Sequence, residues 1–235
     1  MNRKTDAGKI SIVIPVLNEG DTVNTIISHI KTLSCGHAVE IIVSDGDDTG
    51  STIRKIGDKS VIRLISQRGR GAQMNRGAKA ASGDILLFLH ADTFLPDNAF
   101  REIQSAISEK GAVAGAFDIA FDDNRLWFKV ISFTASTRTR LTRIPFGDQA
   151  IFISKRYFDE IGGFLEIPLM EDVEIMKRIK KNGKRISIIP LKVKTSARKW
   201  RSGGLLCTSF RNSLIQFLYK LGVSPERLVA YYYKR

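Results

Sequence analysis

Residues 83–96, with the sequence GDILLFLHADTFLP, contain the apolar run Ile85–Leu89, which ends abruptly in His90, Ala91 and Asp92. An apolar run of this length between turn residues is typical of a strand that is buried on both faces of a sheet. Parallel sheets that are covered by helices bury their strands in this way. The segment therefore predicts a central strand of an α/β domain, with polar side chains directly after its carboxyl end.

The first hundred residues predict a mostly parallel sheet around that strand. Apolar, β-branched segments at residues 10–18, 39–46 and 60–66 have the length of strands, and residues 21–33 place apolar side chains at helical spacing. The alanine-rich segment from Ala72 is compatible with a helix. The predicted order is strand, helix, strand, helix, strand, helix, strand, which favours an α/β fold with helices on both faces of the sheet.

Polar side chains follow three of these strands where each strand ends: Asn18 and Glu19, then Asp45, then His90 to Asp92. Ligands of such sheets bind beyond the carboxyl ends of the strands. We therefore expect these clusters around one crevice. Asp45 has two interpretations: an acceptor for the imide or amine edge of a ligand, and an Asx-type turn in the loop SDGDDTGS.

Asp92 and His90 are candidate ligands of a divalent cation. Mg²⁺ prefers one or two carboxylates together with phosphate oxygens, and Mn²⁺ tolerates a mixed imidazole and carboxylate shell better. Side chains two residues apart on a strand point to the same face. The alternatives are a turn or helix cap for Asp92 and a buried packing histidine for His90.

The second half of the chain predicts a less regular mixture of elements. Residues 113–121 alternate and favour a strand with one solvated face, and residues 125–143 are a basic, amphipathic helix candidate. Residues 170–183 predict a helix with acids early, cations late and a glycine at its end. Residues 185–196 predict another strand, and one or two helices rich in apolar, aromatic and basic residues follow Arg198.

Two further segments carry charged side chains that suit a ligand site. Glu171 and Asp172 open a predicted helix, where acids complement the helix dipole; the functional interpretation is a general base at a helix N-terminus. Arg68 and Arg70 alternate with glycines and suit a diphosphate. Their segment matches neither the Rossmann glycine pattern nor the Walker pattern, and a solvated basic loop is the alternative.

The formal net charge of +13 favours anionic partners such as nucleic acid, phospholipid headgroups or a phosphorylated small molecule. Cys35 and Cys207 make no disulfide framework and indicate reduced thiols in the cytoplasm. The N-terminal segment lacks the apolar region of a secretory signal, and no apolar stretch approaches the roughly 20 residues that span a bilayer. We expect a cytoplasmic protein, with contact at the inner face of the membrane as an open alternative.

Five motifs in order resemble the family 2 glycosyltransferases, which have the GT-A fold. The matching stretches are ISIVIPVLNE, EIIVSDGDDTGST, AQMNRGAKAASGDILLFLHADT, GDQAIFISKRYFDEIGGF and LMEDVEIMKRIKKNG. The segments GRGAQMN, FLHADT, GDQAIF and IPLMEDVE are similar to a bacterial subgroup of family 2-like transferases. The resemblance implies a GT-A domain over residues 9–197, with a nucleotide-binding half at 9–95 and an acceptor-side half at 96–197. Residues 1–8 are then a flexible N-terminus, and residues 198–235 a basic, aromatic helical extension.

On the donor side, the resemblance implies a nucleoside diphosphate sugar as substrate. Pro15, Asn18 and Glu19 are similar to the nucleotide-binding edge of the family. Asp45 corresponds to the family aspartate that contacts the nucleobase. Arg70 lies near the position of a basic residue that meets the base or a phosphate.

The segment His90, Ala91 and Asp92 resembles the D-x-D metal motif of the family and lies against the donor. Asp92 matches the last acid of the motif and implies Mg²⁺ or Mn²⁺ as the cofactor. The first acid of the motif is replaced by His90. Family members often add a late histidine as a further ligand, and this chain has no histidine after His90.

On the acceptor side, the resemblance implies that Asp172 is the catalytic base and that Glu171 orients it or the acceptor. Asp148 and Gln149 resemble a loop that touches the transferred sugar. The implied reaction is a single displacement that inverts the anomeric carbon and transfers the sugar to an acceptor hydroxyl group.

Arg198 and Trp200 resemble an Arg–Trp pair that borders the acceptor and the diphosphate in processive relatives. A surface arginine and a packing tryptophan are the alternatives. The C-terminal segment that follows has three interpretations: packing against the sheet, a homodimer contact, or peripheral contact with a membrane that holds a lipid acceptor.

Three other functions compete with sugar transfer. A nucleotide-sugar-binding protein of this fold without turnover is the first, and His90 is the argument for it. A basic nucleic-acid-binding α/β protein rests on the charge alone and lacks helix-turn-helix, RNP and zinc signatures, so we expect no nucleic-acid partner. A nucleotidylyltransferase would carry a glycine-rich signature near its N-terminus. The corresponding segment of this chain, IPVLNEGDTV, lacks that signature.

Overall fold

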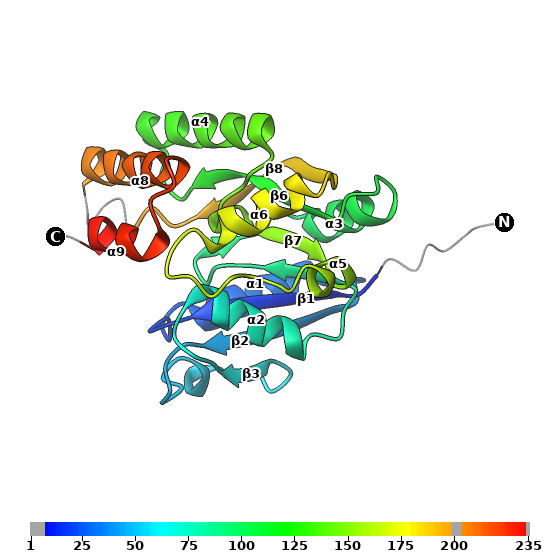
Figure 1. Cartoon of the computed structure of the whole chain (residues 1–235). Helices are drawn as coiled ribbons and strands as arrows, with labels where there is room; N and C mark the ends of the chain where they lie inside the picture. Colours follow the sequence, from blue (N-terminus) through cyan, green and yellow to red (C-terminus); the bar gives the residue numbers. More distant parts are fainter. Residues whose placement is uncertain (1–7, 199–203, 234–235) are drawn as a thin grey trace.

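The computed structural model of the chain describes residues 8–198 and 204–233, and within them the strands form one eight-stranded sheet with helices on both faces (Figure 1). The strands are β1 (Ile10–Val16), β2 (Val39–Asp45), β3 (Ile62–Ile65), β4 (Ile85–Phe88), β5 (Thr93–Phe94), β6 (Ala114–Phe121), β7 (Ile151–Ser154) and β8 (Ile186–Thr195). Their order in the sheet is β3-β2-β1-β4-β7-β6-β8-β5. The pairs β1–β2, β1–β4, β2–β3 and β6–β8 are parallel, whereas β7 runs antiparallel to β4 and β6, and β5 to β8. The predicted α/β fold with a mostly parallel sheet is therefore confirmed.

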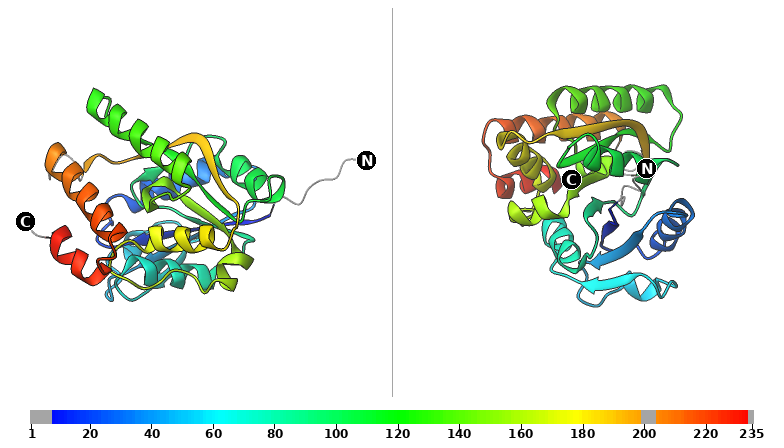
Figure 2. Two further views of the ribbon diagram at one scale, coloured as in Figure 1. Left: turned by 45° about the horizontal axis from the view of Figure 1, so that its top comes forward. Right: turned by 90° about the vertical axis from the view of Figure 1, so that its right-hand side faces the viewer.

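The helices surround this sheet and form an additional layer at one end of the molecule (Figures 1 and 2). They are α1 (Val23–Leu33), α2 (Arg70–Ala80), α3 (Ala99–Ser108), α4 (Leu126–Thr142), α5 (Lys155–Glu160), α6 (Glu171–Lys181), α8 (Leu205–Lys220) and α9 (Pro225–Tyr233). Two short 3₁₀ turns, Ile53–Lys55 and Gly147–Gln149, complete the regular structure of the described residues. The helical segment predicted after Arg198 corresponds to α8 and α9.

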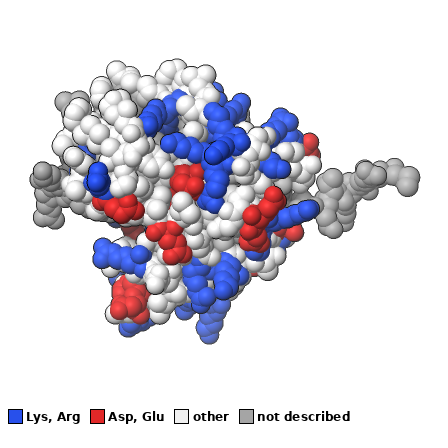
Figure 3. Space-filling view, in the orientation of Figure 1, with Lys and Arg blue, Asp and Glu red and all other residues white. Residues whose placement is uncertain are grey.

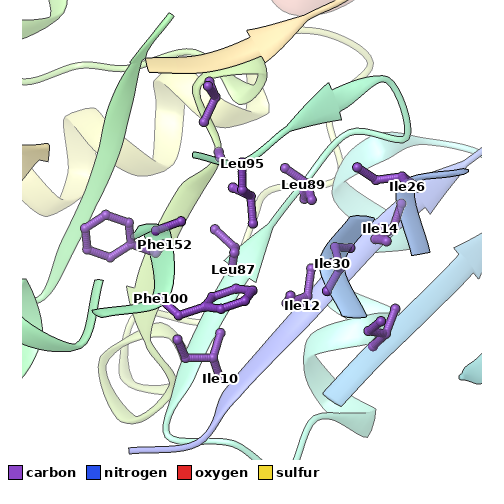
Figure 4. Packing of buried hydrophobic residues seen from close by; sticks show 14 of the residues in the cluster. Ile10, Ile12, Ile14, Ile26, Ile30, Leu87, Leu89, Leu95, Phe100 and Phe152 are labelled. Carbon is purple, nitrogen blue, oxygen red and sulfur yellow. The ribbon is translucent and has the colours of Figure 1, made fainter. Parts of the chain in front are cut away.

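Alternating side chains of the strands fill two apolar cores, one on each face of the sheet. On one face Ile12 and Leu87 belong to a cluster with side chains of α1 and α3 (Figure 4). On the other face Leu86 and Phe88 pack with side chains of α2, α5 and α6. All residues of β4 are buried, and β4 lies between β1 and β7. The prediction of a central strand that is buried on both faces is confirmed.

The connection from β2 to β3 differs from the helix predicted there, because it holds only the 3₁₀ turn Ile53–Lys55. The carboxylate of Asp45 organises this connection. It accepts hydrogen bonds from the backbone N–H groups of Asp47, Thr52 and Ile53. The segment is rich in glycine, aspartate and threonine, which favour turns over a helix. The predicted helix at this position is wrong.

β6 also differs from the prediction of one solvated face, because seven of its eight residues are buried. The reason is α4, which packs along this strand. The Ile119 N–H donates to the hydroxyl of Ser136 on α4 at 3.2 Å. Arg140 of α4 forms an ion pair with Asp118. The polar side chain of β6 is therefore buried beneath a helix and paired with a cation.

The C-terminal helices pack onto the body of the molecule. Ile215 of α8 and Leu228 of α9 are buried. The ammonium group of Lys177 on α6 lies 4.3 Å from the centre of the Tyr219 ring on α8. In the two ranges that the structure describes, no helix is long and apolar enough to cross a bilayer.

Candidate active site

A cavity of about 470 Å³ opens at the carboxyl ends of β1 and β4. Its walls come from the end of β1, the N-terminal ends of α2 and α6, the segment after β4, and inward-facing residues of α8 and α9. The predicted site residues that line it are Pro15, Glu19, Arg70, His90, Ala91, Asp92, Glu171 and Asp172. The expected crevice beyond the sheet therefore exists and brings together residues from both halves of the chain.

Asp92 reaches the cavity because the chain turns sharply after β4. The Thr93 N–H donates to the carbonyl of His90 at 3.1 Å. The Ser196 N–H then donates to the carbonyl of Asp92, also at 3.1 Å, where β5 pairs with β8. These backbone bonds fix the position of Asp92. Burial raises the pKa of Asp92, and the nearby charge of Glu19 raises it further.

Glu19 and Arg198 form the rim of the cavity next to Asp92. A guanidinium nitrogen of Arg198 lies 3.0 Å from Glu19 Oε1, and the hydroxyl of Thr22 donates to Glu19 Oε2 at 2.8 Å. The positive charge of Arg198 counteracts the rise in the pKa of Asp92. Arg198 is not among the residues that line the cavity, so it lies at the rim. Its predicted partner Trp200 lies outside the described residues.

The start of α6 brings two acids to the opposite wall. Met170 precedes the helix in the left-handed region with φ 69°, and Glu171 is only 4% exposed. Asp172 accepts hydrogen bonds from the backbone N–H of Gly147 at 2.6 Å and of Val173 at 2.7 Å. Burial raises the pKa of Asp172 despite these two bonds. Burial and the charge of Asp172 also raise the pKa of Glu171.

The turn Gly147–Gln149 contributes a third acid near this pair. Burial, reinforced by the charge of Asp172, raises the pKa of Asp148 to about 6. Gly147 lies against both walls of the cavity. A Cβ atom at this position would lie 3.0 Å from His90 Nε2 and 3.4 Å from Asp172 Oδ2. A side chain here would be tight against both residues, because the two predicted functional segments lie close together at this glycine.

The charge of Arg70 acts on all three acids, and Arg138 of α4 is a further cation beside Asp148 and Asp172. Burial lowers the pKa of its guanidinium group, whereas the charges of Asp148 and Asp172 raise it. The guanidinium lies 3.7 Å from the centre of the Phe146 ring and donates to Gln216 of α8 at 3.2 Å. Phe146 and Gln216 line the cavity. Sequence analysis did not identify Arg138 as a site residue. The sequence of a basic helix does not show which of its arginines points toward the cavity.

The predicted role of Asp45 is not supported by the structure. Its side chain has no exposed surface, does not line the cavity, and accepts three backbone hydrogen bonds of the β2–β3 connection. Direct contact of Asp45 with a nucleobase stays a prediction. The alternative of an Asx-type turn is confirmed by the bond from the Asp47 N–H.

Three other predicted site residues lie off the cavity wall. Gln149 is buried; it donates to the carbonyl of Phe117 and accepts from the hydroxyl of Thr139 and the N–H of Phe146. Its bonds join α4 to β6, and its contact with a sugar stays a prediction. Asp148 and Asn18 are not part of the wall either. Asn18 is exposed, with φ 58°.

The cavity can hold a divalent cation only if a bound ligand supplies part of the coordination shell. Among the described residues, no group of three or more His, Cys, Asp or Glu side chains is arranged to hold a metal ion. A Mg²⁺-type shell needs one or two carboxylates when phosphate oxygens complete it. Asp92, with Glu19 close enough to raise its pKa, meets that smaller requirement. The donor set therefore fits a cation that binds together with a phosphorylated ligand.

Comparisons with known proteins match the chain to a family and to several relatives. The model of glycosyl transferase family 2 matches residues 11–164. Glucosyl-3-phosphoglycerate synthase of Mycolicibacterium smegmatis is 37% identical over 100 residues, which are 39% of this chain and 33% of that protein. Dolichol-phosphate mannosyltransferase of Pyrococcus furiosus is 30% identical over 112 residues, which are 45% of this chain and 32% of that protein. The match spans about a third of the length of these relatives.

One solved structure shares the fold over most of the chain. A mannosyltransferase from Pyrobaculum calidifontis, PcManGT, in complex with GDP-Man and Mn²⁺, superposes with a TM-score of 0.69. The superposition covers 91% of this chain and 63% of that chain at 17% sequence identity. At this identity the likeness establishes a common fold.

Proposed function

The chain belongs to glycosyl transferase family 2, and from this membership we propose that it transfers a sugar from a nucleoside diphosphate to an acceptor hydroxyl group, with inversion of the anomeric carbon. One observation carries the proposal. Asp92 and Asp172, which are far apart in the sequence, line one cavity together with Arg68 and Arg70. This reaction needs three kinds of group: a carboxylate that binds a cation, a second carboxylate that accepts a proton, and cationic side chains that bind the diphosphate.

The donor diphosphate is proposed to lie at the N-terminus of α2. Arg68, Gly69 and Arg70 line the cavity there, and Gly69 has φ 141°, which favours glycine. Backbone N–H groups at a helix N-terminus bind phosphate, and guanidinium groups strengthen the binding. The solved mannosyltransferase with GDP-Man supports a nucleoside diphosphate sugar as the class of donor.

A divalent cation, Mg²⁺ or Mn²⁺, is proposed at Asp92, with His90 as a further candidate ligand. The Mn²⁺ of the solved mannosyltransferase supports this choice. When bound, such an ion polarises phosphate oxygens and stabilises the leaving diphosphate as a Lewis acid. Arg198 and Glu19, which are paired at the rim, would orient the groups around it.

Asp172 is the proposed general base. The N–H groups of Gly147 and Val173 hold its carboxylate in place, and its raised pKa improves it as a proton acceptor. Asp172 takes the proton of the acceptor hydroxyl as that oxygen forms a bond to the anomeric carbon. The bond from that carbon to the diphosphate oxygen breaks on the opposite side, and its electron pair leaves with the diphosphate. The charge of Asp172 in turn raises the pKa of Glu171 and of Asp148.

The test measures release of nucleoside diphosphate by the full chain from a panel of nucleoside diphosphate sugars with Mn²⁺ and candidate acceptors. We expect Asp172→Asn to lower the rate by about 10²–10⁴-fold, the usual contribution of a general base, while donor binding persists. NMR of the product from an α-linked donor should show a β-linked product. A retained configuration, or full activity of Asp172→Asn, contradicts the proposed mechanism.

A second candidate, binding of a nucleotide sugar without turnover, is favoured by His90 in place of the first acid of the metal motif. The same panel separates the two candidates. Specific donor binding with no release of nucleoside diphosphate under any condition would select the second candidate.

A further inference from the structure

Exposed apolar side chains gather on two helices. Of the eleven large apolar side chains that are exposed in the described residues, eight lie on α4, on α8 or at the end of α8. We call these eight the outer apolar face: Leu126, Trp127, Val130, Phe133 and Leu141 of α4, with Phe210, Phe217 and Leu221 of α8 and its C-terminal end. Large exposed apolar patches mark sites of interaction with a partner or a membrane.

In α4 most of the large apolar side chains face outward, whereas a usual surface helix turns its apolar side chains toward the core. Leu126, Val130, Phe133 and Leu141 recur at helical spacing on the exposed side, and Leu126 and Phe133 are 76% and 71% exposed. The side that packs against β6 carries mostly smaller, polar residues such as Ser136. Burial in the core therefore does not explain the apolar residues of this helix.

α8 continues the same face. Phe210 and Phe217 are 72% and 58% exposed, whereas Ile215 and Gln216, on another side of this helix, line the cavity. The bond between Arg138 and Gln216 joins α4 to α8. The two helices are neighbours in both views of Figure 2, and the corner of the surface that they form is mostly uncharged in Figure 3.

The charged residues of these helices have one sign. Neither α4 nor the segment Leu205–Lys220 contains an aspartate or a glutamate. Lys129 of α4 and Lys220 of α8 are exposed, and Arg140 keeps half of its side chain exposed beside Asp118. An apolar face flanked by cations, with a tryptophan among its members, is the pattern of a helix that lies in a membrane interface.

We propose that the outer apolar face docks the protein onto a lipid bilayer with anionic headgroups. The apolar side chains enter the boundary between headgroups and acyl chains, and the flanking cations meet the anionic headgroups. Charge selects this occupant over a second copy of the chain. A two-fold contact through this face brings the cations of one copy onto those of the other, since both partners present the same patch.

The test is flotation of the full chain with vesicles through a density gradient. The vesicles contain phosphatidylcholine alone or an equimolar mixture of phosphatidylcholine and phosphatidylglycerol. We expect the protein to float with the mixed vesicles and much less with phosphatidylcholine alone, and salt should weaken the binding. Because sugar transfer plays no part in this measurement, its outcome is independent of the proposed function.

The double variant Phe133→Gln with Phe217→Gln should lower the partition coefficient by roughly tenfold or more, because two apolar side chains no longer enter the lipid. The matched control is Ile65→Gln on β3, at the opposite end of the molecule, where the native side chain is 49% exposed. The control should bind as the wild type does. A second variant, Lys129→Gln, should weaken binding to the mixed vesicles by about fivefold.

Three results would overturn the proposal. The first is no flotation with mixed vesicles, and the second is equal binding by the double variant, the control and the wild type. The third is a concentration-dependent dimer in sedimentation without lipid that the double variant abolishes, which would assign the face to a second copy. If the double variant unfolds, as judged by circular dichroism, Lys129→Gln replaces it, and wild-type binding of Lys129→Gln to the mixed vesicles overturns the proposal.

Discussion

At the scale of single residues, Gly147 controls how closely the two acidic segments of the cavity approach. Its N–H donates to Asp172, and its missing side chain leaves room for His90. The sequence offered no reason to single out this glycine for its lack of a side chain, because the close approach arises only when residues that are distant along the chain meet.

We predict that Gly147→Ala disturbs the cavity. The added Cβ lies 3.0 Å from His90 Nε2, so His90 or the turn must move. Such overpacking costs about 1–3 kcal/mol, and the shift of the N–H that holds Asp172 lowers turnover. Urea unfolding and the rate of nucleoside diphosphate release check both effects. The matched control is Gly57→Ala, where no atom lies within 4 Å of the new Cβ; an equal loss in both variants contradicts the explanation.

A second prediction at this scale concerns Asp148 and pH. The pKa of Asp148 is raised from 3.8 to about 6, so the folded state binds a proton that the unfolded state has already lost between these values. The free energy of unfolding therefore falls as pH rises through this window. In Asp148→Asn the contribution of Asp148 to this fall should be absent, and the variant should be more stable than the wild type above pH 6.

The coupling of the two carboxyl groups provides a second measurement. The charge of Asp172 raises the pKa of Asp148, so Asp172→Asn should lower the pKa of the Asp148 carboxyl group. An NMR titration of this carboxyl group in the wild type and the variant checks the expectation. An unchanged pKa of Asp148 in Asp172→Asn would show that the two carboxyl groups do not interact.

At the scale of elements, the strands and the connection between them were predicted with different success. Residues 10–16, 39–45 and 85–88 form strands because their apolar runs specify burial locally. The connection after β2 could not be predicted in detail, since its shape depends on where the carboxylate of Asp45 points. The pattern left both interpretations of Asp45 open, and the structure shows the turn that Asp45 organises.

We predict that Asp45→Ala destabilises the β2–β3 connection. Three backbone N–H groups lose a charged acceptor in a buried setting, which costs about 2–4 kcal/mol. The matched control is Asp48→Ala, because Asp48 is exposed in the same loop. Thermal unfolding of both variants and hydrogen exchange of residues 46–53 check the expectation. Wild-type stability in Asp45→Ala, with donor binding lost, would restore the direct ligand contact.

At the scale of the whole molecule, family and fold were predictable, whereas part of the site was not. The motifs quoted from residues 10–183 identified the family, and the subgroup stays a prediction. The pairing of β7 with both β4 and β6, and the packing of α8 over the cavity, depend on contacts between distant segments. Arg138 and Gln216 were therefore missed, although the acids that they adjoin were found.

Binding of donor and cation is a prediction for the molecule as a whole. A nucleoside diphosphate sugar with Mn²⁺ should raise the melting temperature, since a ligand at a hundredfold excess over its Kd stabilises the native state by about 2.7 kcal/mol. A chelator should remove the metal-dependent part of the shift. Asp92→Ala should show the small shift of the chelated wild type, and an unchanged metal response in this variant places the cation elsewhere.

The continuous sheet limits how substrates enter and leave. β4 from the first half of the chain pairs directly with β7 from the second half, so the two halves share a hydrogen-bonded ladder. Separating them by a hinge, as a bilobed enzyme does, would break that ladder and both apolar cores. We therefore predict that any widening of the cavity involves the elements at its edge, among them α8 and α9, and leaves the sheet intact.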